Sequence, residues 1–311
     1  MKKVMILVLS LLMACASAAA EDAAPSNAFE HVPTAYMGNS PADSRIERVT
    51  YTAKTFQGLE YIKNALIYLP AGYDDNPDAR YDILYLMHGG GENETTFLGG
   101  EGLEKPLKHM LDNMIAAGKI PPVIVCCPNY RVLYCDETKS TQNFPHELRN
   151  HLMPLVESRY RTYAVTADDA GFRASRDHRA FSGFSMGAAA TWRVFETCMD
   201  CIANFAPISG DCWSVSGNAQ RKAQYLADCV AAQGFTAEDF RIYAGCGNKS
   251  DVAYGNLTPQ IEAMKQLDMF PWAETFDSGN LYYAINPSSG HTHATVYAMV
   301  YNSLQRFFGN K

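Results

Sequence analysis

The sequence predicts an α/β fold, a mostly parallel β-sheet covered by helices on both faces, with an antiparallel N-terminal edge. Three observations lead to this prediction. From about residue 83 onward, short apolar runs alternate with segments whose apolar residues recur at helical spacing. Some runs, such as residues 123–127, are apolar throughout, as in strands buried on both faces. Ahead of them, two strand-like segments joined by a glycine-containing turn indicate a hairpin.

The N-terminal half begins with the hairpin and continues as strand, helix, strand, helix. Gly58 separates the two strands of the hairpin, Pro70 ends the second, and Gly118 ends the first helix. The expected strands, alternating or apolar throughout, cover residues 45–56, 61–69, 83–87 and 123–127. The expected helices, with apolar residues at helical spacing, cover residues 103–117 and 144–160.

The C-terminal half keeps the same alternation without interruption. Its strands are short and largely apolar, and each is followed by a longer segment with helical periodicity. The expected strands cover residues 179–184, 202–208, 240–244 and 281–285. The expected helices cover residues 186–197, 219–232, 256–267 and 292–308. Because no repeat or second linker divides these elements, residues 44–311 are expected to form one domain.

The first residues carry the pattern of a secretory signal peptide. Lys2 and Lys3 precede an apolar run over residues 4–14, and small residues follow, so a signal peptide is expected over residues 1–20. The apolar run is shorter than the roughly 20 residues that a membrane-spanning helix needs. Cys15 ends a sequence similar to a bacterial lipoprotein box, which makes a lipid-anchored form the alternative to a secreted one.

Composition narrows the class of protein further. The chain has 311 residues, 47% of them hydrophobic, which suffices for a large core without disulfides or metals. Residues 21–43, rich in Ala, Pro, Ser and Asn, predict a linker. The net charge is −7, and loss of the signal peptide makes it more negative because only lysines are removed. This balance disfavours DNA or RNA as a partner, because phosphates need clustered lysine and arginine.

One motif carries the chemistry of a candidate active site. Residues 183–187, Gly-Phe-Ser-Met-Gly, fit G-x-S-x-G between an expected strand and an expected helix. A nucleophilic serine needs such a tight turn, because the turn exposes its hydroxyl. The glycines remove side chains that would collide, and the helix N-terminus favours negative charge. Ser185 is therefore the candidate nucleophile, the alternative being an ordinary serine in a glycine-rich loop.

A serine nucleophile needs a general base, and in the chain order that follows a G-x-S-x-G turn the histidine comes last. Only His291 and His293 follow Ser185, and both lie after the last expected strand. His291 is the preferred base, because the bend at Gly290 can free its ring. A helix is expected to begin at Thr292, and its first turn would restrain the side chain of His293.

The acid that orients the base is expected after the penultimate strand. Asp251 is the one acid in the loop over residues 245–251, and helix capping is its alternative role. Asp211, which follows the preceding strand, is the second candidate acid.

An oxyanion hole requires two backbone N–H groups. One belongs to the residue after the nucleophile, Met186, and the other to the turn after an early strand. Residues 88–91, His-Gly-Gly-Gly, form that turn, and glycine lets the backbone approach a tetrahedral intermediate closely. Gly90 is the preferred donor, with Gly89 as the alternative. His88 is expected to brace the turn.

The chain resembles the feruloyl and acetyl xylan esterases of carbohydrate esterase family 1, within the esterase D-like α/β-hydrolases. The resemblance covers about residues 60–308. The segments that carry it are residues 68–73, 85–91, 118–120, 177–187, 209–211 and 289–291, together with Asp251. The resemblance implies an α/β-hydrolase fold with nucleophile, acid and base at Ser185, Asp251 and His291. The sequence departs from the family pattern at Ala188, where a second glycine is usual, and in a longer loop around Asp251.

The resemblance implies a secreted serine carboxylesterase that removes acyl groups, most often feruloyl, from plant cell-wall polysaccharide such as xylan. The alternatives are an acetyl xylan esterase, an acyltransferase and a non-catalytic carbohydrate-binding relative. Trp213, Tyr254 and Trp272 could stack on an aromatic acyl group, although packing is the commoner role of such residues. The mechanism requires neither a metal nor an organic cofactor.

Two further groups of residues are given structural interpretations. Cys198 and Cys201 have C-x-x-C spacing at a helix end, without a second pair at zinc-finger distance. A local disulfide or two buried thiols is therefore expected there. His291 and His293 could bind zinc, but the sequence offers no third ligand.

Overall fold

The computed structural model describes residues 29–100, 102–274 and 278–309. Its strands form one eight-stranded sheet in the order β1-β2-β4-β3-β5-β6-β7-β8. β3 to β8 pair in parallel, whereas β1 pairs antiparallel with β2, and β2 antiparallel with β4. The predicted parallel sheet with an antiparallel N-terminal edge is confirmed. The strands are β1 (Arg45–Lys54), β2 (Glu60–Leu69), β3 (Asp82–Met87), β4 (Val123–Cys127), β5 (Arg179–Phe184), β6 (Asn204–Ile208), β7 (Arg241–Gly247) and β8 (Leu281–Asn286).

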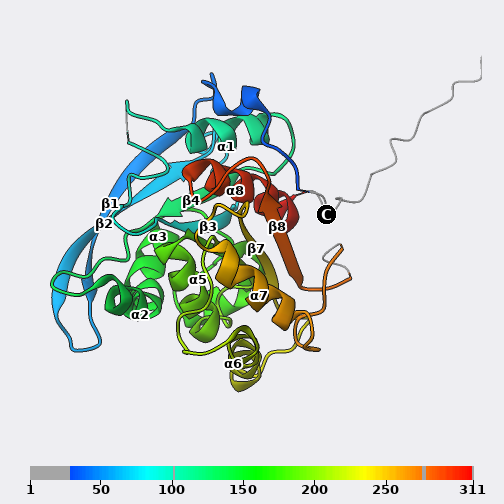
Figure 1. Cartoon of the computed structure of the whole chain (residues 1–311). Helices are drawn as coiled ribbons and strands as arrows, with labels where there is room; N and C mark the ends of the chain where they lie inside the picture. The colour runs from blue at the N-terminus through cyan, green and yellow to red at the C-terminus, as the bar shows by residue number, and fades with distance from the viewer. Residues whose placement is uncertain (1–28, 101, 275–277, 310–311) are drawn as a thin grey trace, which may run out of the picture.

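The β1–β2 hairpin forms one side of the molecule (Figure 1). Its register runs from Arg45 opposite Leu69 to Lys54 opposite Glu60. Buried and exposed residues alternate along the second half of β1, as expected of an edge strand with one solvated face. By contrast, β4, β5 and β6 are buried along their whole length, because helices cover both of their faces.

The helices divide between the two faces of the sheet and make a hydrophobic core on each (Figure 1). On one face, α1 and α8 pack against the sheet, and on the other the remaining helices do so. In the described part of the chain, no helix is long and apolar enough to cross a bilayer. The α-helices are α1 (Pro106–Ala116), α2 (Glu137–Glu147), α3 (Met153–Arg159), α4 (Asp169–Ala174), α5 (Met186–Thr197), α6 (Ala219–Ala232), α7 (Tyr254–Met264) and α8 (His293–Phe308).

The helix expected over residues 144–160 differs most from the structure. α2 begins earlier, at Glu137, where the Asp136 side chain accepts a hydrogen bond from the Lys139 amide. Residues 137–143 are polar, so apolar periodicity gave no sign of this first part. A π-helical turn over Leu148–Leu152 then separates α2 from α3. Because Pro154 lacks an N–H group, it cannot bond the carbonyl four residues back, which favours an irregular turn there.

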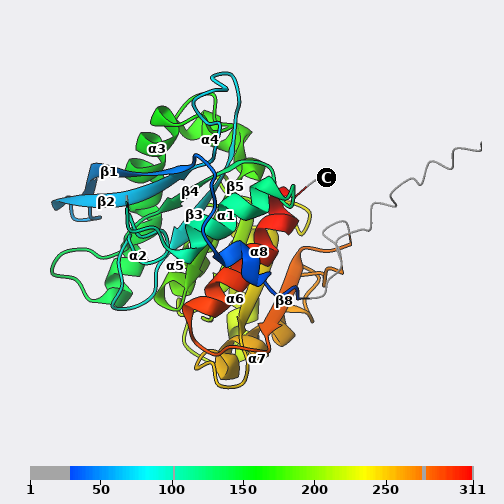
Figure 2. The ribbon, with the colours of Figure 1, turned by 90° about the horizontal axis from the view of Figure 1, so that it is seen from above.

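Residues 29–43, the described part of the predicted linker, pack against the domain. A short 3-10 helix, η1 (Thr34–Met37), lies beside α1 and α8 (Figure 2). The Asn302 side chain bonds the backbone of Glu30 at 2.8 and 3.0 Å, and Asn113 bonds the carbonyl of Tyr36 at 3.1 Å. Apolar side chains of this segment also pack, partly buried, against the core next to α1 and α8. The expected signal peptide lies outside the described residues.

Candidate active site

The expected site residues lie in the loops that follow the carboxyl ends of four parallel strands. The His88–Gly91 turn follows β3, Ser185 follows β5, Asp251 lies in the loop after β7, and His291 lies in the loop after β8. Since β3, β5, β6, β7 and β8 run in the same direction, these ends meet at one edge of the sheet. That edge is where α/β sheets place their sites.

Ser185 occupies a strained turn between β5 and α5. Its backbone has φ +56° and ψ −112°, a conformation that non-glycine residues rarely adopt. A Cβ at Gly183 would lie 2.3 Å from the Gly187 carbonyl oxygen, and one at Gly187 would lie 2.6 Å from the carbonyl oxygens of Met87 and His88. Both glycines of the motif are therefore required by backbone contacts, which is what a nucleophile-bearing turn needs.

The neighbouring loop after β6 supports this turn. The Ser185 amide donates to the Ile208 carbonyl at 2.9 Å. A Cβ at Gly210 would meet the Ala188 Cβ at 2.7 Å and the Ser185 carbonyl oxygen at 2.9 Å. Ala188, the departure from the family pattern, is thus accommodated because a glycine faces it.

Asp251 is buried, and its carboxylate accepts four hydrogen bonds. His291 Nδ1 lies 2.8 Å from Oδ1, and the Ser209 hydroxyl donates to Oδ2 at 2.6 Å. The amides of Ala253 and Gly247 donate to the two oxygens at 2.9 and 2.8 Å. Burial acts to raise the pKa of Asp251, but these hydrogen bonds outweigh it and hold the pKa at about 2. The group is therefore an anion able to orient an imidazole at neutral pH.

The two candidate histidines have different partners. His291, a quarter exposed, lies between Asp251 and the Phe184 ring, whose centroid is 4.5 Å from that of the imidazole. Phe184 directly precedes Ser185, so His291 lies beside the turn that carries the candidate nucleophile. His293 starts α8 and bonds Glu92 at 2.5 Å. The geometry supports His291 over His293 as the base.

The second candidate acid, Asp211, is engaged elsewhere. Its carboxylate pairs with the Lys222 ammonium and accepts a hydrogen bond from the Trp213 indole at 2.8 Å. Asp211 therefore fixes the loop after β6, and of the two candidate acids it is Asp251 that contacts His291.

His88 braces the turn after β3, as its position in the sequence predicts. Its side chain is buried and stacks on the Tyr130 ring, with centroids 4.8 Å apart. Its two nitrogens lie 2.8 Å from the Gly89 carbonyl oxygen and 3.1 Å from Asn129 Oδ1. Burial lowers the pKa of His88.

Two carboxylates hold the backbone of this turn on either side of Gly90. Glu92 accepts the Gly89 N–H at 2.7 Å, and Glu137 accepts the Gly91 N–H at 3.0 Å. Among the described residues, the Gly90 N–H has no acceptor. A Cβ at Gly90 would lie 3.3 Å from Met186 Cγ, so this turn and the start of α5 are adjacent. The arrangement favours Gly90 over Gly89 as the donor that joins Met186.

Sequence reasoning missed three of these supporting residues. Glu92 and Glu137 hold the turn, and Ser209 donates to Asp251 from a left-handed conformation with φ +53°. Glu92 closely follows the glycine run, and Ser209 belongs to a segment that resembles the family, so both carried a signal. Glu137 carried none, because it lies 46 residues from the amide that it binds.

The aromatic candidates for substrate binding occupy different places. Trp213 is half-exposed and lies on the loop after β6, at the same edge as Ser185. Tyr254 begins α7 and packs partly against the core. Trp272 pairs with Leu281 at the amino end of β8, so it lies at the opposite edge of the sheet. Trp213 therefore fits a substrate contact best, and Trp272 does not.

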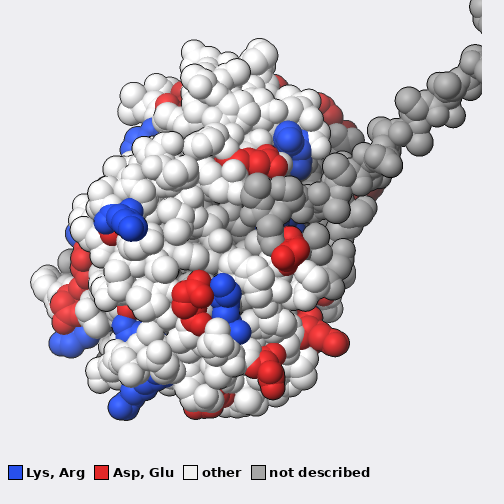
Figure 3. Space-filling model, turned by 45° about the vertical axis from the view of Figure 1, so that its right-hand side comes forward, with Lys and Arg blue, Asp and Glu red and all other residues white. Residues whose placement is uncertain are grey.

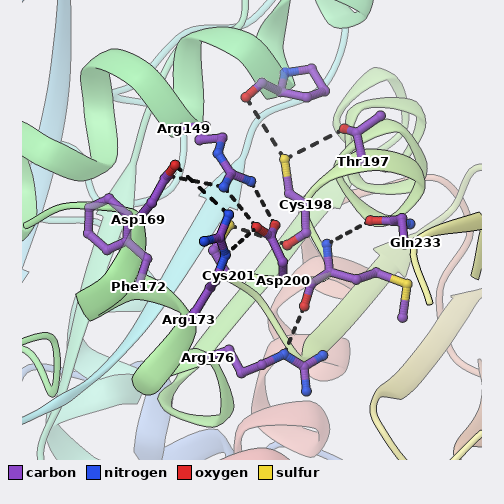
Figure 4. A network of polar contacts seen from close by, with 12 residues as sticks. Arg149, Asp169, Phe172, Arg173, Arg176, Thr197, Cys198, Asp200, Cys201 and Gln233 are labelled. Atoms are coloured by element: carbon purple, nitrogen blue, oxygen red, sulfur yellow. Dashed lines mark hydrogen bonds and ion pairs between the residues drawn. The ribbon is translucent and has the colours of Figure 1, made fainter. Parts of the chain in front are cut away.

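The Cys198 to Cys201 segment follows the C-terminal end of α5, whereas Ser185 lies at its N-terminal end. Figure 4 shows the polar contacts around this segment. Both thiols are buried and free, and Cys201 Sγ contacts the Cys198 carbonyl at 3.3 Å. Arg149 and Arg173 hold Asp200 between them. In the part of the chain that the structure describes, no three His, Cys, Asp or Glu residues are grouped as metal ligands would be.

Charged side chains are scattered over the face drawn in Figure 3, with wide neutral areas between them. No broad basic area appears on this face, in keeping with the negative net charge of the chain.

Comparison with known proteins places these observations in a family. Residues 59–266 match the Esterase family model, described as "Putative esterase". The chain is 38% identical over 292 residues to endo-1,4-beta-xylanase Y of Acetivibrio thermocellus, covering 91% of this chain and 26% of that protein. It is 27% identical to an endo-1,4-beta-xylanase/feruloyl esterase of Xylanibacter ruminicola, covering 71% and 27%. The chain thus spans about a quarter of the length of these curated relatives.

Solved structures agree with these matches. The feruloyl esterase module from Clostridium thermocellum, solved as a serine-to-alanine mutant with sinapinate, superposes with a TM-score of 0.82. It is 37% identical, and the match covers 92% of this chain and 96% of that one. A ferulic acid esterase of Anaeromyces mucronatus, 20% identical with a TM-score of 0.63 over 89% and 96% of the two chains, shares the fold.

Proposed function

Because the chain belongs to the esterase family, within the feruloyl and acetyl xylan esterases of carbohydrate esterase family 1, and is a serine ester hydrolase, we propose that it removes feruloyl groups from xylan. Its 37% identical neighbour was solved with sinapinate, a hydroxycinnamate like ferulate, which supports an aromatic acyl group. The signal pattern over residues 1–20 supports export of the protein to the outside of the cell, which is where xylan is found.

In the proposed reaction, His291 takes the proton of Ser185 as its hydroxyl oxygen attacks the ester carbonyl carbon. Asp251, ionised and buried, accepts the Nδ1–H of His291 and stabilises the imidazolium that forms. The N–H groups of Gly90 and Met186 bind the oxygen of the tetrahedral intermediate. The imidazolium then gives its proton to the leaving sugar oxygen, which leaves an acyl-enzyme.

The second half of the reaction repeats these steps with water. His291 takes a proton from water as the water oxygen attacks the acyl carbon. The tetrahedral intermediate collapses, the proton returns to Ser185, and ferulate leaves. In this proposal Trp213, about half exposed on the loop after β6, stacks on the aromatic ring of the acyl group.

The observation that carries the proposal is the contact between the buried anion Asp251 and His291, beside the strained turn of Ser185. The test compares hydrolysis of methyl ferulate and of acetylated xylan by the wild type and by Ser185→Ala. We expect the wild type to favour methyl ferulate, and Ser185→Ala to lose about 10⁶-fold in kcat. A preference for acetyl esters would make the chain an acetyl xylan esterase instead, and an active Ser185→Ala protein would refute the mechanism.

A further inference from the structure

A groove of about 930 Å³ lies between β2 and the loop that leads from β4 into α2. None of Ser185, Asp251 and His291 lines it. We propose that this groove binds the neutral sugar chain that carries the ester, on the alcohol side of the scissile bond. The inference rests on the proposed function for the identity of the substrate, and on the structure for the place where the chain lies.

Glu137 connects the groove to the candidate oxyanion turn. Glu137 lines the groove and also accepts the Gly91 N–H at 3.0 Å. A Cβ at Gly90 would lie 3.1 Å from Glu137 Oε2 and 3.3 Å from Met186 Cγ. A ligand in the groove therefore lies next to the Gly90 turn, and this turn faces Met186.

The order of the strands separates the groove from the acyl candidate Trp213. The groove lies over β2 and the loop after β4, whereas Trp213 follows β6. β3 and β5, which carry the Gly90 turn and Ser185, lie between them in the sheet. The two halves of an ester held at Ser185 would extend in opposite directions. If the aromatic acid lies toward Trp213, the sugar lies toward the groove.

The polar lining suits a ligand rich in hydroxyl groups. Arg131 donates from a guanidinium that is about half exposed, Asn129 can donate and accept, and Glu137 accepts. The charged side chains of the lining are four carboxylates and two cations, and one cation, Lys63, is buried against Glu147 at 2.7 Å. This balance repels an anionic polymer such as polygalacturonate and leaves a neutral polymer as the fitting ligand.

The rim of the groove supplies an aromatic surface. Tyr134 is 92% exposed, and its neighbour Leu133 is 60% exposed, while Ile62 on the opposite wall is 76% exposed. Tyr134 has φ +64°, a left-handed conformation that bulky residues rarely adopt and that occurs often at ligand sites. A tyrosine held in this way offers its ring face to the apolar C–H face of a sugar.

The direct test measures binding without hydrolysis. Ser185→Ala protein is titrated calorimetrically with arabinoxylo-oligosaccharides that carry no ester and with polygalacturonate oligomers. We expect binding of the neutral oligosaccharides only, weakened about tenfold by the additional change Tyr134→Ala and retained with Tyr134→Trp. The matched control is Tyr163→Ala, another exposed tyrosine, which stacks on His178 near the amino ends of β3 and β5. With this change added, the Ser185→Ala protein should bind the neutral oligosaccharides with unchanged affinity.

A kinetic test separates failure of this inference from failure of the proposed function. The ratio of kcat/KM on a feruloylated arabinoxylo-oligosaccharide to kcat/KM on methyl ferulate should fall about tenfold in Tyr134→Ala. A wild type that hydrolyses neither substrate would refute the proposed function. A wild type that hydrolyses both, with Tyr134→Ala unchanged in affinity and in this ratio, would overturn the groove assignment. Equal affinity for polygalacturonate would also overturn it.

Discussion

Burial and hydrogen bonding act in opposite directions on the Asp251 carboxylate. Burial alone raises the pKa of a carboxyl group, because the charged form loses its hydration. The donors His291 and Ser209 and the amides of Gly247 and Ala253 reverse that effect. An acid prepared in this way stays ionised beside the histidine, so in the proposed reaction the proton removed from Ser185 resides on His291.

Asp251 therefore makes the stability of the protein depend on pH. Its pKa is about 2 in the folded protein against a reference of 3.8, so the carboxylate stabilises the fold above pH 3.8. That contribution, about 2 kcal/mol, is lost as pH falls through 2. Asp251→Asn should lower the free energy of unfolding at pH 6, and the difference from wild type should shrink toward pH 2.5. Urea unfolding across this range measures it, and a difference that does not change with pH contradicts the assignment.

Glu92 is expected to act through the turn that it holds. Glu92→Ala frees the Gly89 N–H, and the Gly90 donor loses its fixed direction. We expect kcat on methyl ferulate to fall roughly tenfold or more with little change in KM, because only the transition state loses a contact. Glu92→Gln, which keeps an acceptor oxygen, should recover most of the rate.

The control for this prediction is Glu262→Ala, a change of an exposed glutamate on α7 paired with Lys265. It should leave kcat unchanged. If Glu92→Ala raises KM and leaves kcat intact, Glu92 contacts the substrate and does not position the turn.

At the scale of single residues, the sequence indicates a residue only where a local pattern restricts the choice. Ser185 and Asp251 could be proposed as candidates because a motif points to one serine and the loop over residues 245–251 holds one acid. The choice of His291 over His293 depended on local helix geometry, which periodicity also indicates. The contact of Glu137 with Gly91 spans 46 residues and depends on how a polar loop folds, which no local pattern encodes.

At the scale of elements, the junction of β5 and α5 leaves no space for a side chain. A Cβ at Gly187 would lie 2.6 Å from the carbonyl oxygens of Met87, the last residue of β3, and of His88, far closer than real contacts. Gly187→Ala should therefore move β3 and α5 apart, lowering stability by roughly 1–3 kcal/mol and abolishing most activity.

The matched control is Gly255→Ala in α7, where a Cβ would meet no atom within 4 Å and φ is not left-handed. Alanine favours helix, so this change should leave the melting temperature equal or slightly higher. The melting temperature and the rate of methyl ferulate hydrolysis are measured for both variants. Gly187→Ala with wild-type stability and rate would show that the turn is not held as described.

The elements that could be predicted are those whose apolar periodicity and ends agree. The bounds predicted for β5, α5 and α6 match the structure, because each has apolar spacing and a clear cap or glycine at an end. The start of α2 was wrong because its first residues are polar and depend on the Asp136 cap. The six-residue α4 was not anticipated, since it is too short to show a period.

At the scale of the whole molecule, parallel pairing brings distant residues together. Ser185, Asp251 and His291 follow three different strands, and the common direction of those strands places them at one edge. The sequence sufficed to predict this convergence because alternating strands and helices imply a parallel sheet. It could not predict the groove, which depends on how the loop after β4 packs against β2.

The N-terminal segment over residues 29–43 is expected to contribute to the stability of the entire domain. Its Phe29, Val32, Tyr36 and Met37 pack partly buried against the core shared by α1 and α8. A chain that begins at residue 44 should lose roughly 2–4 kcal/mol of unfolding free energy relative to one that begins at residue 29. The rate on methyl ferulate per folded molecule should not change, because the segment contacts no candidate site residue. Equal unfolding midpoints for the two chains would contradict this role.

The measurement that tests the central claim most directly is covalent labelling with a fluorophosphonate, followed by mass spectrometry of the peptides. A phosphonylated Ser185 should form rapidly in the wild type and in His293→Ala, and orders of magnitude more slowly in His291→Ala, which lacks the base. Ser185→Ala should take up no label. Labelling at another residue, or a rate in His291→Ala equal to that of the wild type, would contradict the proposed relay of Ser185, His291 and Asp251.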